Sequence, residues 1–356
     1  MQILLVLVIV FCPPSDEAMA VIDAPFEMKC ADKDAKKLIP TTKAFENQDF
    51  LQSHEARNIR VMCEFQEPAI RLRAAGVRGT ILFFGSARSM LKSEYDKTME
   101  RLQGNLKAAE EAKDAPGVVE AKGKLAKFEK VQWMCEWAEV AETLARRLTE
   151  WAMNNRLLNS SFHGDPAGET RRRQPLVVTT GGGPGIMEAA NRGAASVPGG
   201  ITMGMGISLP FEKGLNPFVT KGLAFEFQYF FTRKFWMMYY AKALVVGPGG
   251  FGTMDELFEL LTLRQTGKLP DFPIVLLCSK YWKTVINWQA MVDFGTISQE
   301  EVDRLCFADN AEEAFQHIRV NIEGGHSPMP NVSPSHRAAK PISGDDPIPA
   351  KLSLDE

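Results

Sequence analysis

Two glycine-rich turns, each preceded by a short apolar run, constrain the fold of this chain more than any other feature. Residues 176–188 read LVVTTGGGPGIME, and residues 243–256 read ALVVGPGGFGTMDE. Short apolar, β-branched runs are typical of buried parallel strands, and a helical pattern follows each set of glycines. Such a turn lets backbone N–H groups approach a phosphate at the start of a helix. Two of them in one sheet predict a phosphorylated, nucleotide-like ligand held between them.

A third run of the same kind, GTILFFGSAR at residues 79–88, also passes from an apolar strand into a glycine turn. Residues 201–209 and 273–278 add further apolar strands, the second of them expected to be the last. Strands alternating with helices predict an α/β fold, a doubly wound, Rossmann-like parallel sheet. Ligands bind such sheets beyond the carboxyl ends of the strands, where the strand order reverses. We therefore expect the turns near Gly85, Gly181 and Gly249 to converge there.

The pattern also predicts how the chain is divided. Residues 1–55 lack sustained periodicity and are expected to be an N-terminal extension, with a targeting segment as one interpretation. Residues 56–323 are predicted to form one nucleotide-binding catalytic domain, interrupted by a helical excursion at 93–151. Residues 324–356 are rich in Pro and Ser, which predicts a disordered tail.

Helical spacing of apolar residues gives three more specific expectations. Residues 56–75 are predicted to be a helix that Pro68 breaks or kinks. Residues 122–153 are predicted to form one long helix that closes the excursion, with an apolar stripe that packs rather than binds. The aromatic-rich residues 218–240 are predicted to be helical in character.

Composition narrows the possible partners and compartments. The 356 residues carry a formal net charge of -3. This charge gives no general attraction to nucleic acid, and it does not favour stable association with an anionic membrane. The dense basic cluster at residues 171–173 is explained as well by a solvated loop as by a phosphate contact. The six cysteines lack a CxxC motif and the five histidines lack an HExxH motif. We therefore expect a cytoplasmic protein without a metal site.

The first residues complicate this localisation. Residues 3–11 are apolar and residues 18–20 read AMA, as in a signal peptide and its cleavage site. The basic segment that should precede the apolar run is missing, and the run is too short to span a bilayer as a helix. A weak targeting signal and a non-native start upstream of Met19 or Met28 both remain open.

Each motif also has a purely structural interpretation. Residues 181–185 match neither the GxGxxG fingerprint nor a Walker A loop, and could be a tight turn without a ligand. Thr253 and Glu256 have the spacing of a capping box. Arg233 and Glu256 could form a structural ion pair. The aromatic side chains of residues 225–240 could pack in the core or in a dimer interface, or stack on a base.

The combined motifs resemble one family. PGGFGTMDE at residues 248–256, preceded by Arg233-Lys234 and by GGGPGIM at 181–187, is similar to the LONELY GUY (LOG) family, formerly labelled lysine decarboxylases. The similarity extends from about Thr80 to Cys278. It implies a homodimeric phosphoribohydrolase that needs no cofactor. Such an enzyme cleaves the N-glycosidic bond of a nucleoside 5′-monophosphate, either a cytokinin riboside monophosphate or AMP, to a free base and ribose 5-phosphate.

The resemblance assigns roles to individual residues. Arg233 and Glu256 match the catalytic arginine and glutamate of the family. The positions that match its phosphate-, ribose- and base-contacting segments are expected to bind substrate. They are Gly85, Ser86, Arg88, Gly181, Gly182, Gly183, Gly185, Met187, Glu188, Lys234, Gly249, Gly250, Gly252 and Thr253.

The chain departs from short family members at several points. Residues 228–232 read QYFFT, where short members often carry Asp-Met-His, and Glu188 stands where many have glycine. The excursion at 93–151 is also longer. The chain therefore resembles a longer branch of the family, and its base preference stays open.

The chemistry that the resemblance implies has competitors. Cleavage of the C1′–N bond builds positive charge on the ribose, which the Glu256 carboxylate would stabilise while Arg233 holds the substrate. A nucleotide-binding sensor of the same fold would bind without turnover. A pyridoxal-phosphate-dependent decarboxylase would need a Schiff-base lysine, for which Lys234 is the one candidate near the proposed site.

Overall fold

The computed structural model describes residues 41–155, 174–209 and 214–324. Contacts between residues divide the chain into two units, residues 1–56 and 57–356. In the first, a 3₁₀ turn (η1, Ala44–Glu46) precedes a short helix (α2, Gln48–Gln52). The predictions for residues 1–40, for the basic cluster at 171–173 and for the tail beyond 324 concern segments outside the described residues.

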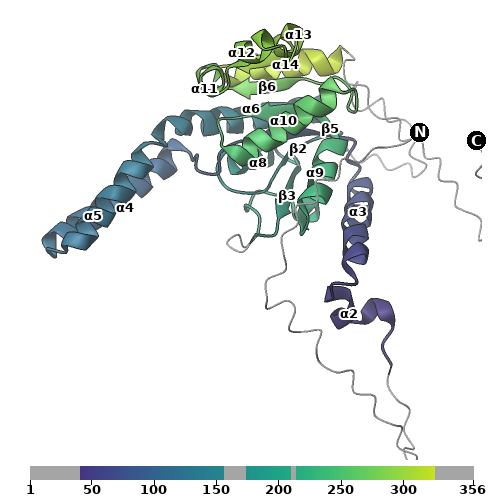
Figure 1. Ribbon diagram of the computed structural model, residues 1–356, viewed down its shortest axis with the longest axis horizontal. Coiled ribbons are helices and arrows are strands. Elements are labelled where there is room, and N and C mark those ends of the chain that lie inside the picture. The colour runs from purple at the N-terminus through teal and green to yellow at the C-terminus, as the bar shows by residue number, and fades with distance from the viewer. Residues whose placement is uncertain (1–40, 156–173, 210–213, 325–356) are drawn as a thin grey trace, which may run out of the picture. The chain divides into compact units, whose positions relative to one another are not determined.

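The second unit is built on one parallel sheet (Figure 1). Its strand order is β4-β3-β2-β1-β5-β6-β7, and every neighbouring pair runs parallel. The strand order reverses at β1, which lies between β2 and β5. This arrangement confirms the predicted α/β doubly wound fold. The strands are β1 (Gly79–Phe84), β2 (Leu176–Thr180), β3 (Thr202–Ile207), β4 (Ala224–Phe227), β5 (Ala241–Val246), β6 (Ile274–Leu277) and β7 (Leu305–Ala308).

Helices cover both faces of this sheet (Figure 1). The longer ones are α3 (Arg57–Ala74), α4 (Lys92–Glu111), α5 (Ala115–Glu129), α6 (Cys135–Asn154), α8 (Ile186–Ala195), α9 (Phe230–Tyr239), α10 (Phe251–Gln265) and α14 (Ala311–Glu323). The shorter ones are α11 (Ser279–Val285), α12 (Trp288–Asp293), α13 (Gln299–Asp303) and the 3₁₀ turns η2 (Gln132–Met134) and η3 (Lys221–Leu223).

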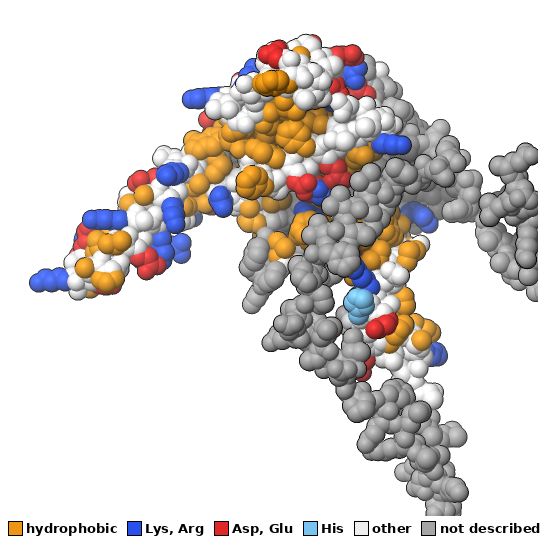
Figure 2. Space-filling model, viewed as in Figure 1, with side chains coloured by type: hydrophobic (Ala, Val, Ile, Leu, Met, Phe, Trp, Pro, Cys, Tyr) orange, Lys and Arg blue, Asp and Glu red, His pale blue; other side chains and the backbone are white. Residues whose placement is uncertain are grey.

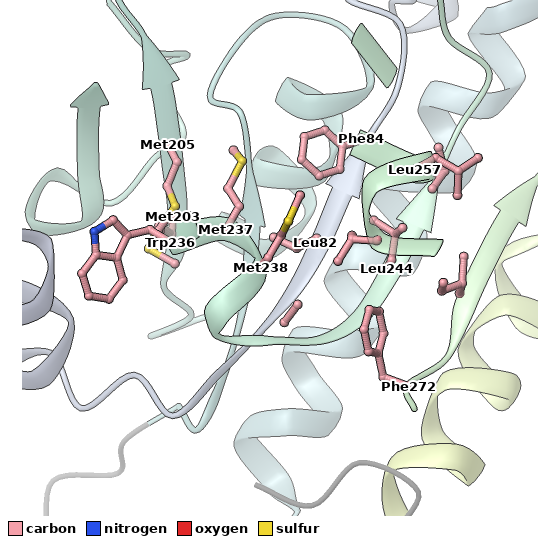
Figure 3. Close-up of a cluster of buried hydrophobic side chains, with 14 of the residues drawn as sticks. Leu82, Phe84, Met203, Met205, Trp236, Met237, Met238, Leu244, Leu257 and Phe272 are labelled. Carbon is pink, nitrogen blue, oxygen red and sulfur yellow. The ribbon is translucent and has the colours of Figure 1, made fainter. Parts of the chain in front are cut away.

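Alternation along the strands sorts the core into two clusters. Leu82 and Phe84 of β1 pack with side chains of α9 and α10, including Trp236 and Leu257 (Figure 3). The intervening Phe83 packs on the opposite face with side chains of α6, α8 and α14. Side chains of successive strand residues point to opposite faces of a sheet. Because both faces are covered by helices, β1 is apolar at nearly every position instead of alternating.

The predicted long helix at 122–153 is wrong. Helix α5 ends at Glu129, a 3₁₀ turn follows at Gln132–Met134, and α6 begins at Cys135. The two helices serve different partners: Phe128 of α5 stacks on Tyr95 of α4, whereas Trp137 of α6 is buried against the sheet. One straight helix could not direct its apolar stripe at both, so the chain turns between them.

Three other expectations need correction. Residues 218–240 are not helical throughout, because β4 occupies Ala224–Phe227 with Phe225 and Phe227 buried and Glu226 exposed. Helix α3 runs without a break through Pro68, so the predicted break is absent, while the predicted kink stays a prediction. Residues 273–278 do not hold the last strand, since β7 and α14 follow.

Two further findings bear on expectations from composition. Within the described ranges, no helix has the length and apolar character needed to cross a membrane. Among the same residues, no group of His, Cys, Asp and Glu side chains is arranged to hold a metal ion. The described cysteines, Cys63, Cys135, Cys278 and Cys306, are free thiols.

Candidate active site

The three glycine turns meet at the carboxyl ends of β2, β1 and β5, which are neighbours in the sheet. The Ser86 N–H donates to the Pro248 carbonyl at 2.9 Å, and the Ile186 N–H donates to the Ser86 carbonyl at 3.2 Å. Ser86, in the first turn along the chain, thus joins the other two. The expected convergence at the reversal of strand order is present, and it is held by backbone hydrogen bonds.

Packing requires some of the glycines independently of any ligand. A Cβ atom on Gly85 would lie 2.7 Å from the side chain of Ile186, and one on Gly247 would lie 2.4 Å from it. Gly185 has φ +78°, and a Cβ atom there would lie 2.2 Å from the Ser86 carbonyl oxygen. These three glycines therefore let the turns approach one another, which is a structural role beside any contact with substrate.

We call the turns at residues 181–185 and 247–250 the first and second principal turns. Arg233 extends from α9 to the first of them. Its Nε donates to the Met205 carbonyl at 2.8 Å. A Cβ atom on Gly181 would lie 2.7 Å from Nη2 of Arg233, so the guanidinium lies directly against the backbone of that glycine. The side chain of Met187 covers the same turn, since a Cβ atom on Gly183 would lie 2.9 Å from its Cε.

Glu256 lies on α10, just beyond the second turn, and is only 4% exposed. Its Oε2 is buried without a hydrogen-bond partner in the described structure. Burial raises the pKa of this carboxyl to about 7, although the charges of Lys234 and Arg233 oppose the shift. A buried carboxylate that has an unpaired oxygen and two nearby cations can stabilise positive charge that develops on a bound substrate.

The capping-box interpretation of Thr253 and Glu256 is not supported. Helix α10 begins at Phe251 after Gly250, and no side chain caps its N-terminus. Thr253 is instead buried and folds over Gly249, where a Cβ atom would lie 2.2 Å from its Oγ1.

Lys234 forms ion pairs with two carboxylates of α10. Its Nζ lies 2.6 Å from Oδ2 of Asp255 and 2.7 Å from Oε2 of Glu259. Burial alone would lower the pKa of Lys234, but these hydrogen bonds outweigh it and the pKa is raised. A Schiff-base lysine needs a lowered pKa, so this environment argues against the decarboxylase interpretation.

The remaining predicted residues fall into two groups. Gly182, with φ +74°, belongs to the first principal turn, where Glu188 is half-buried at the start of α8, and Gly250 and Gly252 are exposed at the second. Arg88 is exposed and is one of the residues that line a groove between α4 and α5.

Sequence reasoning missed a polar network that shapes the first principal turn. Nδ2 of Asn216 is within hydrogen-bonding distance of the Gly182 and Gly183 carbonyls and donates to Oδ1 of Asn191. Thr180 Oγ1 donates to the same Asn191 oxygen at 2.7 Å and accepts from the Gly182 N–H at 2.8 Å. A buried amide and a partly buried one that are linked in this way fix a loop strongly, yet no periodic pattern marks them.

It also missed the contact that fixes α9. Oε1 of Glu64, on α3, accepts from the Gln228 N–H at 2.7 Å, and its Oε2 accepts a short hydrogen bond from Thr232 Oγ1. The Glu64 carbonyl accepts from Nε1 of Trp236 at 2.8 Å. Three successive contacts therefore hold the helix that carries Arg233.

One of three comparisons with known proteins agrees with the motifs. The family model described as "Possible lysine decarboxylase" matches residues 187–318, which include Arg233, the second principal turn and Glu256. No curated protein matches the chain. A solved structure of a molybdenum cofactor binding protein from the phototrophic bacterium Rippkaea orientalis is 17% identical, with a TM-score of 0.31 over 52% of this chain and 87% of that one.

Residues 187–318 of the chain are therefore similar to the family described as possible lysine decarboxylases, in agreement with the resemblance of the glycine and arginine–glutamate motifs to LOG proteins.

Proposed function

We propose that this chain hydrolyses the N-glycosidic bond of a nucleoside 5′-monophosphate, a cytokinin riboside monophosphate or AMP. The observation that carries the proposal is the buried Glu256 carboxyl, which has a free oxygen and lies near Arg233 where two glycine turns meet. The family match supports a nucleotide-related activity, and the specific reaction is our inference from the site.

In this proposal the 5′-phosphate lies on the glycine turns. Helices α8 and α10 begin at Ile186 and Phe251, directly after Gly185 and Gly250. The N–H groups in the first turn of a helix lack intrahelical partners and carry partial positive charge, so they attract phosphate. Arg233, against the backbone of Gly181, adds a permanent charge beside the same turn.

Glu256 supplies the chemistry. As the C1′–N bond breaks, its electron pair leaves with the base, and C1′ gains positive charge that an ionised Glu256 stabilises. Glu256 then accepts a proton from the water whose oxygen bonds to C1′. The proton is passed on to the departing base, so the products are the free base and ribose 5-phosphate. A carboxyl with a pKa of about 7 is suited to both accepting and releasing a proton near neutral pH.

A base-release assay tests the proposal. We expect the purified protein to release free base from AMP or isopentenyladenosine monophosphate, and not from the corresponding nucleosides, because the glycine turns need the 5′-phosphate. Quantifying the free base for all four compounds checks this and identifies the preferred base. Binding of the monophosphates without release would favour the nucleotide sensor instead.

We also propose a homodimer. The exposed face of α9 carries Phe231, Phe235 and Tyr239, with exposed fractions of 48%, 40% and 48%. A row of half-exposed aromatic side chains on the helix that carries Arg233 is typical of a protein interface. Light scattering of the purified chain would test the dimer.

Replacing Glu64 by alanine is expected to lower kcat for base release about tenfold without a comparable change in the binding of AMP. Glu64 is a positioning residue: it contacts Gln228 and Thr232 at the start of α9, and its loss lets Arg233 move. A misplaced group costs rate by roughly this factor or more. Glu64→Gln should rescue kcat because its side chain can still accept one of these hydrogen bonds and donate in the other.

Gln66→Ala, at an exposed position of the same helix, serves as the control and should leave kcat unchanged. If Glu64→Ala and Gln66→Ala gave the same kcat, the positioning role would be wrong.

A further inference from the structure

An open groove lies between α4 and α5, outside the proposed catalytic site. Its volume is about 480 Å³, within the range of small-molecule sites. Leu102, Phe128 and Val131 provide apolar lining, and Arg88, Arg101, Lys124 and Lys127 are its charged residues. The two helices form the hairpin of the predicted excursion (Figure 1).

The charges of the hairpin are segregated. Residues 92–130 contain nine basic and eight acidic side chains, yet the charged residues that line the groove are all basic. Two of the acidic side chains pair with cations outside the groove, Glu94 with Arg192 and Glu110 with Lys122, whereas Glu120 pairs with the groove residue Lys124. Figure 2 shows basic and acidic side chains mixed over the visible side of this hairpin. A concave surface with one sign of charge on a nearly neutral element predicts an anionic ligand.

Three of the four cations have no acidic partner in the part of the chain that the structure describes. Among the described residues, no carboxylate lies within salt-bridge distance of Arg88, Arg101 or Lys127, whereas Lys124 pairs with Glu120 at 2.6 Å. Arginine and lysine side chains that converge without carboxylates can form charge-assisted hydrogen bonds with phosphate groups.

The apolar lining has an aromatic ring in a fixed orientation. The ring of Phe128 stacks on that of the buried Tyr95, with centroids 4.8 Å apart and an interplanar angle of 8°. Phe128 is itself only half-buried and lines the groove. An aromatic ring that is held by stacking on one side can stack on a planar ligand at low entropic cost.

Arg88 connects the groove to the glycine turns. Its backbone N–H donates to Ser86 Oγ at 3.1 Å, and the Ser86 N–H donates to the Pro248 carbonyl of the second principal turn. A ligand that binds the Arg88 side chain would therefore contact the same short loop that joins the turns.

We propose that the α4–α5 groove binds a second small molecule, an organic polyanion with a planar ring and two or more phosphate groups. The ring would stack on Phe128, and the phosphates would bind Arg88, Arg101 and Lys127. This site takes a different ligand from the nucleoside monophosphate of the proposed reaction, and it does not depend on turnover.

Isothermal titration calorimetry with ATP as the probe tests this proposal. In the absence of divalent metal, we expect ATP to bind the full-length chain that carries Glu256→Gln and is saturated with AMP, because this variant should bind AMP without hydrolysing it. Arg101→Glu with Lys127→Glu should weaken binding about tenfold or more, because each reversal removes a charge-assisted hydrogen bond and adds repulsion. Lys97→Glu with Lys107→Glu reverses two exposed charges of α4 outside the groove and should leave ATP affinity nearly unchanged.

Phe128→Leu distinguishes the contribution of ring stacking to ATP binding from that of the charged residues. It should weaken the binding of ATP and leave that of inorganic tripolyphosphate unchanged, since tripolyphosphate has no ring to stack. Equal losses of ATP affinity in the two double variants would overturn the proposal, as would tripolyphosphate binding as tightly as ATP. Absence of base release from AMP would contradict the proposed hydrolase alone and leave this result standing.

Discussion

Replacing Glu256 by glutamine is expected to abolish base release and, in the same protein, to stabilise the fold at alkaline pH. Both effects follow from a carboxyl that is 4% exposed and whose pKa burial raises to about 7. Glutamine keeps the shape of the side chain but can neither carry the negative charge that C1′ requires nor accept a proton from water. We expect kcat to fall by about a thousandfold or more, with the binding of AMP largely retained.

The stability effect has a defined pH window. A carboxyl with a folded pKa above its unfolded value of 4.5 favours the native state at acidic pH, and this contribution is lost as pH rises through about 7. At pH 8 the native wild type must hold a buried negative charge that Glu256→Gln lacks. The variant should then be more stable by up to about 3 kcal/mol, and the two proteins should converge near pH 4.

Thermal unfolding of both proteins from pH 4 to pH 9 measures this difference directly. Glu100→Gln, an exposed glutamate on α4, is the control and should show no such pH-dependent gain. An active Glu256→Gln enzyme would remove the assigned role. A stability difference that did not grow with pH would contradict the raised pKa.

Sequence predicted the central strands because their residues are apolar at consecutive positions and glycines mark their ends. β1, β2 and β5 were located to within two residues, and the meeting of their turns followed from the rule for strand order. β4 was missed because its alternation spans only Ala224–Phe227, inside an aromatic segment that also suits a helix. β7 is equally short, and no glycine turn marks it.

Part of the candidate site could also be predicted from the sequence, because some of its residues lie in local motifs. Arg233 and Glu256 lie in motifs whose spacing is local, and the structure places both beside the glycine turns. Glu64 and Asn216 act through hydrogen bonds to residues 164 and 34 positions away, Gln228 and Gly182. Such pairings depend on tertiary structure and leave no periodic signal. Arg88 was assigned to the site by the family resemblance, which stays a prediction, and it also lines the α4–α5 groove, which no sequence pattern marks.

Replacing Gly185 by alanine is expected to destabilise the protein far more than the same change at Gly199. Both glycines have a positive φ, +78° at Gly185 and +77° at Gly199, so alanine is strained at either position. Gly185 also has a ψ of −134°, outside the left-handed helical region that other residues can enter. In the left-handed helical region a positive φ costs alanine about 1 to 2 kcal/mol. The space differs: a Cβ atom at 185 would lie 2.2 Å from the Ser86 carbonyl oxygen, and one at 199 would meet only Cε of Met153 at 3.6 Å.

The clash at 185 cannot be relieved by a side-chain rotation, since the obstacle is backbone. To make room, the turn after β2 must move away from the loop after β1, which breaks the hydrogen bond from Ile186 to Ser86. We expect Gly185→Ala to lose more than about 3 kcal/mol of unfolding free energy, and any folded fraction to release base slowly. Urea denaturation of both variants, with base release measured on the folded protein, checks this. Equal losses at 185 and 199 would show that φ alone sets the cost, and that the close approach of the two turns contributes nothing to the fold.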